Sequence, residues 1–153
     1  MEEIEFKINK ALDSDILLHL KECDELFKPH LSTIVNINEY AKKIKNNALN
    51  IEAWVNNNLI GLVACYANDK GQNKAYITNV SVSPEYLKRH IACNLLDKCI
   101  EIVKEKGFSR IELEVEQSNN VAISIYKKKG FIIDKKRNTK NFMVKIIYNN
   151  EPE

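Results

Sequence analysis

The chain has 153 residues, 44% of them hydrophobic and 29% charged, with a formal net charge of +2. This is the size and composition of one soluble globular domain, residues 1–153, and it excludes a disordered or fibrous chain. Acidic and basic residues are interleaved, with no basic stripe carrying aromatics, which argues against nucleic acid as the main partner.

The first half of the chain predicts two helices and three strands. The N-terminus "MEEIEFKINK" is acidic and no long apolar run follows, so we expect a cytoplasmic protein without export signal, membrane span or membrane partner. Apolar spacing places a strand at 4–8, helices at 13–27 and 37–48, and strands at 51–55 and 59–67. Asp13 or Ser14 is expected to cap the first helix, Pro29 to end it, and three asparagines at 56–58 to form a hairpin turn.

The second half predicts a crossover and a closing hairpin. A strand at 74–83 stops at Pro84, and a helix from about Tyr86 to Lys106 ends at Gly107. A strand at 108–116, a short helix at 120–129 and a hairpin of 131–136 with 141–147 complete the chain. The order β-α-α-β-β-β-α-β-α-β-β indicates a mixed α/β single domain whose sheet is too hydrophobic to be exposed on both faces.

The four cysteines give no sign of a disulfide framework or a metal site. Cys23, Cys65, Cys93 and Cys99 form no CxxC pair, and the three histidines lie at no metal-ligand spacing from them. We expect reduced, partly buried thiols that behave as small hydrophobes, and no metal cofactor.

The stretch "PEYLKRHIACNLL", residues 84–96, looks like a phosphate cradle but contains no glycine. It joins a strand to a helix, where free backbone N–H groups can bind an anion. If His90 has ordinary helical geometry, its ring can point away from the ligand while Lys88 and Arg89 add charge-assisted contacts. The alternative is that these three residues are a solvated first turn of the helix.

Two segments in the C-terminal half resemble the two sequence signatures of the GNAT N-acyltransferases. "VSVSPEYLKRHIACNLL" resembles the acyl-CoA-binding segment, although Leu87 stands where the family has Gln or Arg and His90 where it has its first Gly; Ala92 keeps the small final position. "LEVEQSNNVAISIYKKKGF" is similar to the second signature and most like bacterial ribosomal-protein N-terminal acetyltransferases. The resemblance implies a mostly antiparallel twisted sheet of six to seven strands flanked by about four helices, with acetyl-CoA as co-substrate.

The resemblance also implies which residues bind the co-substrate. The exit strand would pair its backbone with the pantetheine amides, and one of its N–H groups would serve as oxyanion donor. Asn119 would contact the pantetheine arm, and as a good N-cap it also has a structural use. The residues assigned to acetyl-CoA in this way are Val80, Ser81, Val82, Lys88, Arg89, His90, Ile91, Ala92, Asn119 and Tyr126.

Acetyl transfer to an amine needs a base for the ammonium proton and an acid for the departing thiolate. A phenol has a pKa near ~10, close to the ~8.5 of a thiol, so the resemblance assigns the acid to Tyr126. It assigns the base to Glu114, acting directly or through water in a direct transfer with a tetrahedral intermediate. Both residues also have structural interpretations: Tyr126 as an aromatic packed on the sheet, and Glu114 as part of a polar strand face with Glu112 and Glu116.

The acceptor amine cannot be named from the sequence. The resemblance places its site between the first two helices, where Phe27, His30 and Tyr40 are the candidate contacts, and a peptide N-terminus, an amino acid or an amino sugar all fit. A covalent route through Cys93 is an alternative within the same class, although no base is visibly paired with that thiol. The alternative from another class is a CoA-binding or regulatory module without turnover. Exposed edge strands near the C-terminus are compatible with a homodimer.

Overall fold

The computed structural model describes residues 3–68, 71 and 73–147. Their element order is the predicted one, with short 3₁₀ turns at Asp24–Leu26, Leu31–Thr33 and Pro84–Tyr86. The strands are β1 (Glu5–Ile8), β2 (Leu49–Val55), β3 (Asn58–Tyr66), β4 (Lys74–Val82), β5 (Arg110–Glu116), β6 (Ile132–Arg137) and β7 (Lys140–Ile146). The helices are α1 (Asp13–Cys23), α2 (Ile37–Asn47), α3 (Ile91–Glu105) and α4 (Asn120–Lys128).

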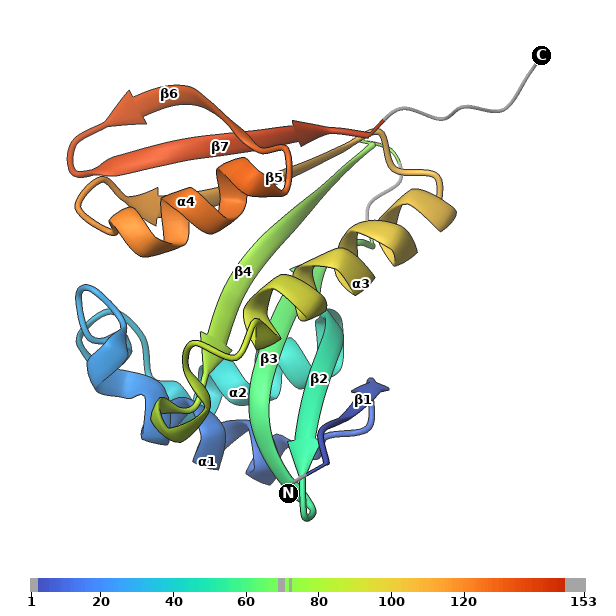
Figure 1. Cartoon of the computed structure of the whole chain (residues 1–153), viewed down its shortest axis with the longest axis vertical. Coiled ribbons are helices and arrows are strands. Elements are labelled where there is room, and N and C mark those ends of the chain that lie inside the picture. Colours follow the sequence, from blue (N-terminus) through green and yellow to red (C-terminus); the bar gives the residue numbers. More distant parts are fainter. Residues whose placement is uncertain (1–2, 69–70, 72, 148–153) are drawn as a thin grey trace.

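The strands form one seven-stranded sheet in the order β1-β2-β3-β4-β5-β7-β6 (Figure 1). Neighbouring strands are antiparallel except β4 and β5, which are parallel and joined by the crossover helix α3. The predicted fold class, a mostly antiparallel sheet with four helices, is therefore confirmed.

Each face of the sheet is covered by a pair of helices. Helices α3 and α4 lie on one face, over a core that includes Leu95, Leu96 and Phe131. Helices α1 and α2 lie on the other, where Ile16 and Ile44 pack against strand residues of β2 and β3. In β2 every residue is buried, because successive side chains enter one core and then the other.

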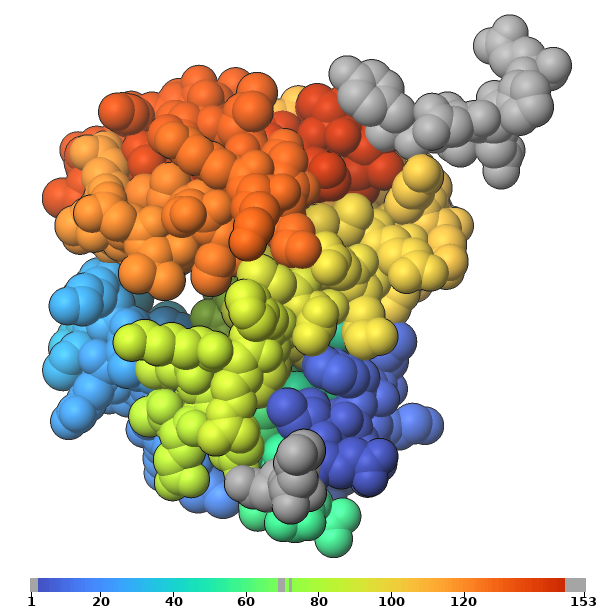
Figure 2. Space-filling view, viewed as in Figure 1, coloured from blue at the N-terminus to red at the C-terminus, as the bar shows by residue number. Residues whose placement is uncertain are grey.

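Strands β4 and β5 are paired at one end only. Their register runs from Lys74 opposite Arg110 to Tyr76 opposite Glu112, and β4 then continues to Val82 paired with β3 alone. A register shift between Ala64 and Cys65 leaves Thr78 as an extra residue in β4, and a bulge of this kind bends a strand. Figure 1 shows β4 and β5 diverging beyond this point, and Figure 2 shows a hollow between the C-terminal segments and the blue N-terminal ones.

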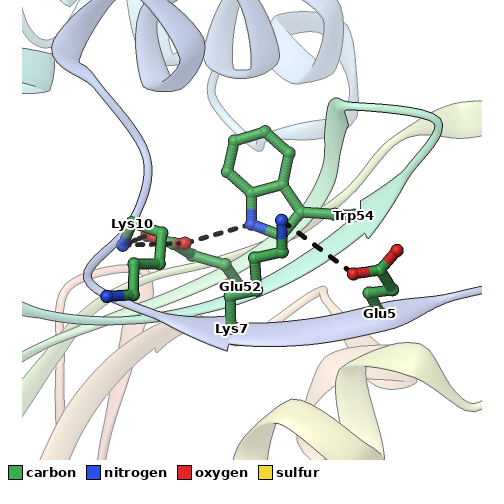
Figure 3. A network of polar contacts seen from close by, with 5 residues as sticks. All are labelled: Glu5, Lys7, Lys10, Glu52 and Trp54. Carbon is green, nitrogen blue, oxygen red and sulfur yellow. Dashed lines mark hydrogen bonds and ion pairs between the residues drawn. The ribbon is translucent and has the colours of Figure 1, made fainter.

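The chain between β1 and α1 is fixed by a buried carboxylate (Figure 3). Glu52 in β2 is fully buried, and its two oxygens accept hydrogen bonds from the backbone N–H groups of Lys10 and Ala11 at 3.0 to 3.1 Å. The indole N–H of Trp54 donates to the same carboxylate at 3.0 Å. Lys7 lies over the Trp54 ring at 5.3 Å from its centroid. These contacts fix the position at which α1 begins.

Helix α1 begins at Asp13 as predicted, but its cap and its end differ from the prediction. Helix α1 is capped at Leu12, whose N–H group donates to Asp15 at 2.9 Å, so Asp13 and Ser14 already lie inside the helix. It ends at Cys23, well before Pro29, and continues as a 3₁₀ turn at Asp24–Leu26. The prediction missed this end because apolar spacing continues through the tighter turn.

The helix predicted from about Tyr86 begins only at Ile91. Pro84 starts a separate 3₁₀ turn, and Leu87 is extended, so the chain has to reverse before it can enter α3. It does so with positive φ at Lys88 (65°) and at His90 (60°). The condition of helical geometry at His90 is therefore not met: His90 is the N-cap, in the left-handed conformation that favours glycine.

The predicted turns are confirmed. Asn56 and Asn57 have φ of 48° and 65° between β2 and β3, as a tight hairpin requires, and Gly107 has φ of 89° after α3. The hairpin of β6 and β7 turns at Asn138 and Thr139, so Lys140 belongs to β7 and not to the turn. Across the described part of the chain, no helix combines the length and the apolar character needed to cross a bilayer.

Candidate active site

A cleft of about 490 Å³ opens where β4 and β5 diverge (Figure 2). Five parts of the chain line it: the end of α1 with the α1–α2 connection, β4, the approach to and start of α3, β5 with α4, and the first residue of β7. The lining residues from the first three parts are Cys23, Leu26, Phe27, Lys28, Pro29, Leu31, Ile34, Thr78, Asn79, Val80, Ser81, Val82, Leu87 and Ala92. Those from β5 onward are Glu114, Val115, Glu116, Asn119, Val121, Ala122, Ile125, Tyr126 and Lys140.

The exit half of β4 forms one wall of the cleft. Val80, Ser81 and Val82 all line it, as the resemblance implies for the strand that pairs with pantetheine. Their backbone pairs with β3 on one edge, and on the other edge no described residue of β5 is in register with them. This free edge can accept an extended ligand by strand addition.

The start of α3 lies at the edge of the same cleft. His90 caps the helix without a side-chain hydrogen bond, so the first backbone N–H groups of α3 have no partner from a capping side chain. Lys88, Arg89 and His90 are exposed, and Arg89 stacks over the Tyr86 ring at 5.1 Å. Ala92 lines the cleft, whereas Ile91 is buried in the core. The residues predicted to bind the diphosphate therefore differ in position. Lys88, Arg89 and His90 are exposed, Ala92 lines the cleft, and Ile91 belongs to the core.

Helix α4 brings Asn119 and Tyr126 to the opposite wall. The Asn119 side chain accepts a hydrogen bond from the N–H of Ala122 at 3.2 Å, which confirms it as the N-cap. Tyr126 lines the cleft but is only 8% exposed, with its ring packed edge-on against Phe131 at 6.0 Å between centroids. Burial raises the pKa of Tyr126 above its ordinary value, so the phenol stays protonated at neutral pH. Tyr126 thus belongs to the core and also lines the cleft.

Glu114 lies on the polar side of β5 and lines the cleft. Its carboxylate is 3.6 Å from the ammonium group of Lys140, which also lines the cleft. Glu116 lines the cleft as well, but Glu112 does not and pairs with Arg110 at 3.0 Å. The shared polar face that provides the structural interpretation of Glu114 is therefore present, and of its three carboxylates only those of Glu114 and Glu116 reach the cleft.

The three candidate acceptor contacts have different positions. Phe27 lines the cleft. His30 is exposed and lies outside the lining, with its carbonyl accepting a hydrogen bond from Thr33. The Tyr40 hydroxyl lies 3.0 Å from the carbonyl of Thr78 and 2.8 Å from its hydroxyl, and burial raises the pKa of Tyr40. Tyr40 therefore supports the bulge in β4 from behind the cleft.

The sequence analysis missed a buried histidine next to the cleft. His19 of α1 is 2% exposed, and its Nε2 atom lies 2.9 Å from the hydroxyl of the lining residue Ser81. Its Nδ1 atom lies 3.3 Å from the hydroxyl of Ser83. Burial lowers the pKa of His19 to about 4, so the ring is neutral at pH 7. A single histidine at helical spacing signals burial and nothing more, which is why no pattern could identify it.

The cysteines are free thiols, as predicted. Cys23 lines the cleft, but burial raises its pKa to about 12, which disfavours the thiolate. Cys93, the candidate for a covalent route, is half-buried in the first turn of α3 and is not a lining residue. Within the described ranges, no three His, Cys, Asp or Glu side chains are placed to hold a metal ion.

Comparison with known proteins gives a consistent result. The family model described as "Acetyltransferase (GNAT) family" matches residues 15–131. A putative [ribosomal protein bS18]-alanine N-acetyltransferase of Bacillus subtilis is 41% identical over 56 residues, 37% of this chain and 37% of that protein. A spermidine N(1)-acetyltransferase of Thermoplasma acidophilum is 30% identical over 99 residues, 64% and 60% of the two chains. The chain thus spans less than two thirds of these relatives.

The fold is also found among solved structures. The PaiA N-acetyltransferase of Thermoplasma acidophilum, in complex with coenzyme A, superimposes with a TM-score of 0.72 at 22% identity. The superposition covers 94% of this chain and 99% of that one.

Proposed function

Because the chain belongs to the acetyltransferase (GNAT) family, we propose that it transfers the acetyl group of acetyl-CoA directly to a primary amine. The observation that carries this proposal is the free edge of β4 beside the uncapped start of α3, at the mouth of one cleft. An extended arm bearing amides suits the first feature, and a diphosphate suits the second. Coenzyme A has both groups.

The residues present fit each part of the co-substrate. Val80 to Val82 supply backbone N–H and C=O groups for the pantetheine arm, and one of these N–H groups serves as oxyanion donor. The backbone from His90 to Ala92 supplies N–H groups for the diphosphate, and Lys88 and Arg89 add positive charge.

Tyr126 is the proposed acid, because its phenol lines the cleft and is protonated at neutral pH. Burial raises its pKa, so this phenol is a weaker acid than a free tyrosine and its match to the ~8.5 of a thiol is less close. Glu114 is the proposed base, directly or through water, and Asn119 the contact to the pantetheine arm. The thiols do not support the covalent route, since the lining Cys23 is held protonated and Cys93 lies outside the lining.

The acceptor is a primary amine that enters beside Phe27, in the α1–α2 connection. The names of the two relatives give a ribosomal-protein alanine and spermidine as their acceptors. Both a peptide N-terminus and a polyamine therefore belong in the acceptor panel. The lining of the cleft balances Glu114 and Glu116 against Lys28 and Lys140, which gives no excess negative charge for a polycation. A monoamine is therefore favoured over a polyamine.

The test has two steps. Coenzyme A at about 100 times its Kd should stabilise the protein by about 2.7 kcal/mol in a thermal-shift titration. Acetyl-CoA with peptide N-termini, amino acids, amino sugars and spermidine should then release free thiol with at least one amine. No stabilisation by coenzyme A would contradict the proposal, and stabilisation without thiol release across the panel would favour the CoA-binding or regulatory module.

We also propose a cytoplasmic location and a homodimer that pairs through the edge strand β6. The support for the dimer is the free edge of β6 and its exposed Ile132, which is 63% accessible. The charged residues Lys135, Lys136 and Arg137 on the same strand work against such pairing. Light scattering at micromolar concentration distinguishes monomer from dimer, and Ile132→Lys should return a dimer to monomer.

A further inference from the structure

A chain of hydrogen bonds runs along the face of β4 that is covered by α1 and α2. The Ser83 hydroxyl lies 3.3 Å from Nδ1 of His19, and Nε2 of His19 lies 2.9 Å from the Ser81 hydroxyl. The Ser81 hydroxyl donates to Oδ1 of Asn79 at 2.8 Å. All four residues are buried, and Ser81 and Asn79 line the cleft.

A separate contact joins the same stretch of chain to the second helix. The Tyr40 hydroxyl donates to the carbonyl of Thr78, the residue before Asn79, at 3.0 Å and lies 2.8 Å from the Thr78 hydroxyl. The end of β4 and the following Ser83, residues 78 to 83, are thus tied to α1 through His19 and to α2 through Tyr40. The side chains involved are far apart in sequence: His19 and Ser81 are separated by 62 positions and Tyr40 and Thr78 by 38.

The direction of these bonds follows from counting protons. The Ser81 hydroxyl has one hydrogen and gives it to Asn79, so toward His19 it can only accept. Nε2 of His19 must therefore carry the ring hydrogen, and Nδ1 must accept from Ser83. A neutral imidazole with hydrogen on Nε2 satisfies both serine contacts, whereas an imidazolium would leave Nδ1 without an acceptor role. Burial outweighs the backbone groups of Leu59 and Ser81, which favour the charged ring.

The surroundings keep the ring neutral despite nearby carboxylates. Burial lowers the pKa of His19 to about 4, and the adjacent Cys23 thiol, 3.7 Å from Nε2, is protonated because its own pKa is raised. A second cavity, behind the ring, is lined by Asp15 and Glu22 of α1 and by Glu85. None of these three carboxylates makes a hydrogen bond to the ring among the described contacts.

We propose that His19 is a positioning residue, a fixed neutral hydrogen-bond donor that holds the splayed half of β4 in place and so keeps the cleft open. Beyond Tyr76 this half has lost β5 as a neighbour, so one edge of the strand has no partner strand to hold it. The hydrogen bonds from His19 and Tyr40 replace that support from one face. The inference rests on the proposed function only in its consequence for coenzyme A binding.

Glutamine distinguishes a fixed donor from a base. His19→Gln keeps an N–H donor for Ser81 and an oxygen acceptor for Ser83, but it cannot exchange a proton at neutral pH. His19→Leu has similar volume and removes both functions. Ile16→Ala, on the same helix and fully buried in the α1–α2 core, is the control for general destabilisation.

Hydrogen exchange of residues 77–83 tests the positioning role without any ligand. His19→Leu should speed exchange in this segment at least about tenfold relative to β2, while His19→Gln and Ile16→Ala should change both strands equally. In the wild type, ¹⁵N spectra of the imidazole should show hydrogen on Nε2 between pH 6 and 8. Equal acceleration in all three variants, or hydrogen on Nδ1, would overturn the proposal.

Coenzyme A titration tests the consequence. His19→Leu should weaken the Kd for coenzyme A about tenfold, and His19→Gln should restore it to within about threefold of wild type. A His19→Gln variant as weak as His19→Leu would overturn the fixed-donor role. If wild type itself binds no coenzyme A, the proposed function fails, and the exchange and ¹⁵N results still decide whether His19 supports β4.

Discussion

The two faces of the sheet are held in different ways. The face under α3 and α4 has an apolar core, whose aromatic members Phe131 and Tyr126 pack against each other. The face under α1 and α2 contains six of the seven buried polar residues: His19, Asn50, Glu52, Asn79, Ser81 and Ser83. One face is thus stabilised mainly by packing, and the other by packing together with a set of buried hydrogen bonds. The cleft lies between them and depends on both.

The largest expected effect tests the polar face directly. Glu52→Leu keeps the volume but leaves the N–H groups of Lys10, Ala11 and Trp54 without their acceptor. At about 1 to 3 kcal/mol for each unsatisfied buried donor, partly relieved by water, we expect a loss of about 3 to 4 kcal/mol in the free energy of unfolding. Urea denaturation measures it, and Glu52→Gln should recover about half.

The matched change on the apolar face is Leu95→Ala. It should lower the free energy of unfolding by about 2 to 5 kcal/mol, because it leaves a cavity in the core under α3. If Glu52→Leu costs less than about 1 kcal/mol, the two faces do not differ in the way described, because the buried carboxylate would then be replaceable by packing.

This difference explains how much of the fold could be predicted. Apolar spacing found α3, α4 and every strand, because a stripe such as Leu95, Cys99 and Val103 repeats along one face of its own helix. Several hydrogen bonds of the polar face join residues far apart in sequence, such as Ala11 with Glu52, 41 positions apart, and His19 with Ser83, 64 positions apart. No local pattern records such pairs, so the cap of α1 and the role of Glu52 could not be predicted.

The site divides in the same way. The second signature located Glu114, Asn119 and Tyr126, and the structure brings all three to the cleft. The first signature located the bend but not its backbone, since the positive φ of Lys88 and His90 depends on how Pro84 and α3 pack. His19 and Tyr40, which support β4 from the polar face, have no sequence signal beyond burial.

The next effect concerns Tyr126, the one tyrosine among the described residues that belongs to the apolar core and lines the cleft. Tyr126→Phe should lower kcat about 100-fold, or about 2.7 kcal/mol in the barrier, because the leaving thiolate loses its proton donor. Stability should change by less than about 1 kcal/mol, because no hydrogen bond to the Tyr126 hydroxyl is found among the described residues. The assay uses the best acceptor of the amine panel.

The control for this variant is Tyr76→Phe, a tyrosine of β4 that does not line the cleft and is 36% exposed. It should leave kcat within about twofold of wild type. If Tyr126→Phe left kcat unchanged across pH, Tyr126 would be a packing residue only. The apolar face would then contribute no catalytic group to the cleft.

The third effect is a pH dependence that belongs to the polar face alone. The pKa of His19 is lowered to about 4 in the folded state against 6.5 for an ordinary histidine, so the unfolded chain binds the extra proton between these values. The contribution of His19 to the free energy of unfolding therefore has its full value above pH 6.5 and falls as the pH drops toward 4. Between pH 7.5 and pH 5 the loss should be about 2 kcal/mol.

Urea denaturation at the two pH values measures the loss in wild type and in His19→Gln. The variant should lack this component, and the exposed His30→Gln should keep it. An equal pH dependence in wild type and His19→Gln would mean that the buried ring does not titrate as described, and that the acid sensitivity comes from carboxylates instead.

The smallest effect concerns the backbone where α3 enters the apolar face. His90 has φ of 60° and ψ of 20° as N-cap of α3, a conformation that costs a residue with a Cβ about 1 kcal/mol and costs glycine little. His90→Gly should therefore raise the free energy of unfolding by about 0.5 to 1 kcal/mol, measured by urea denaturation. Leu87→Gly is the matched control, because Leu87 has φ of −65° and glycine there only adds freedom to the unfolded chain. It should lower stability by a similar amount. Opposite signs for the two variants would show that the strain lies at His90 itself, whereas a destabilised His90→Gly would mean that contacts of the imidazole outweigh the backbone cost.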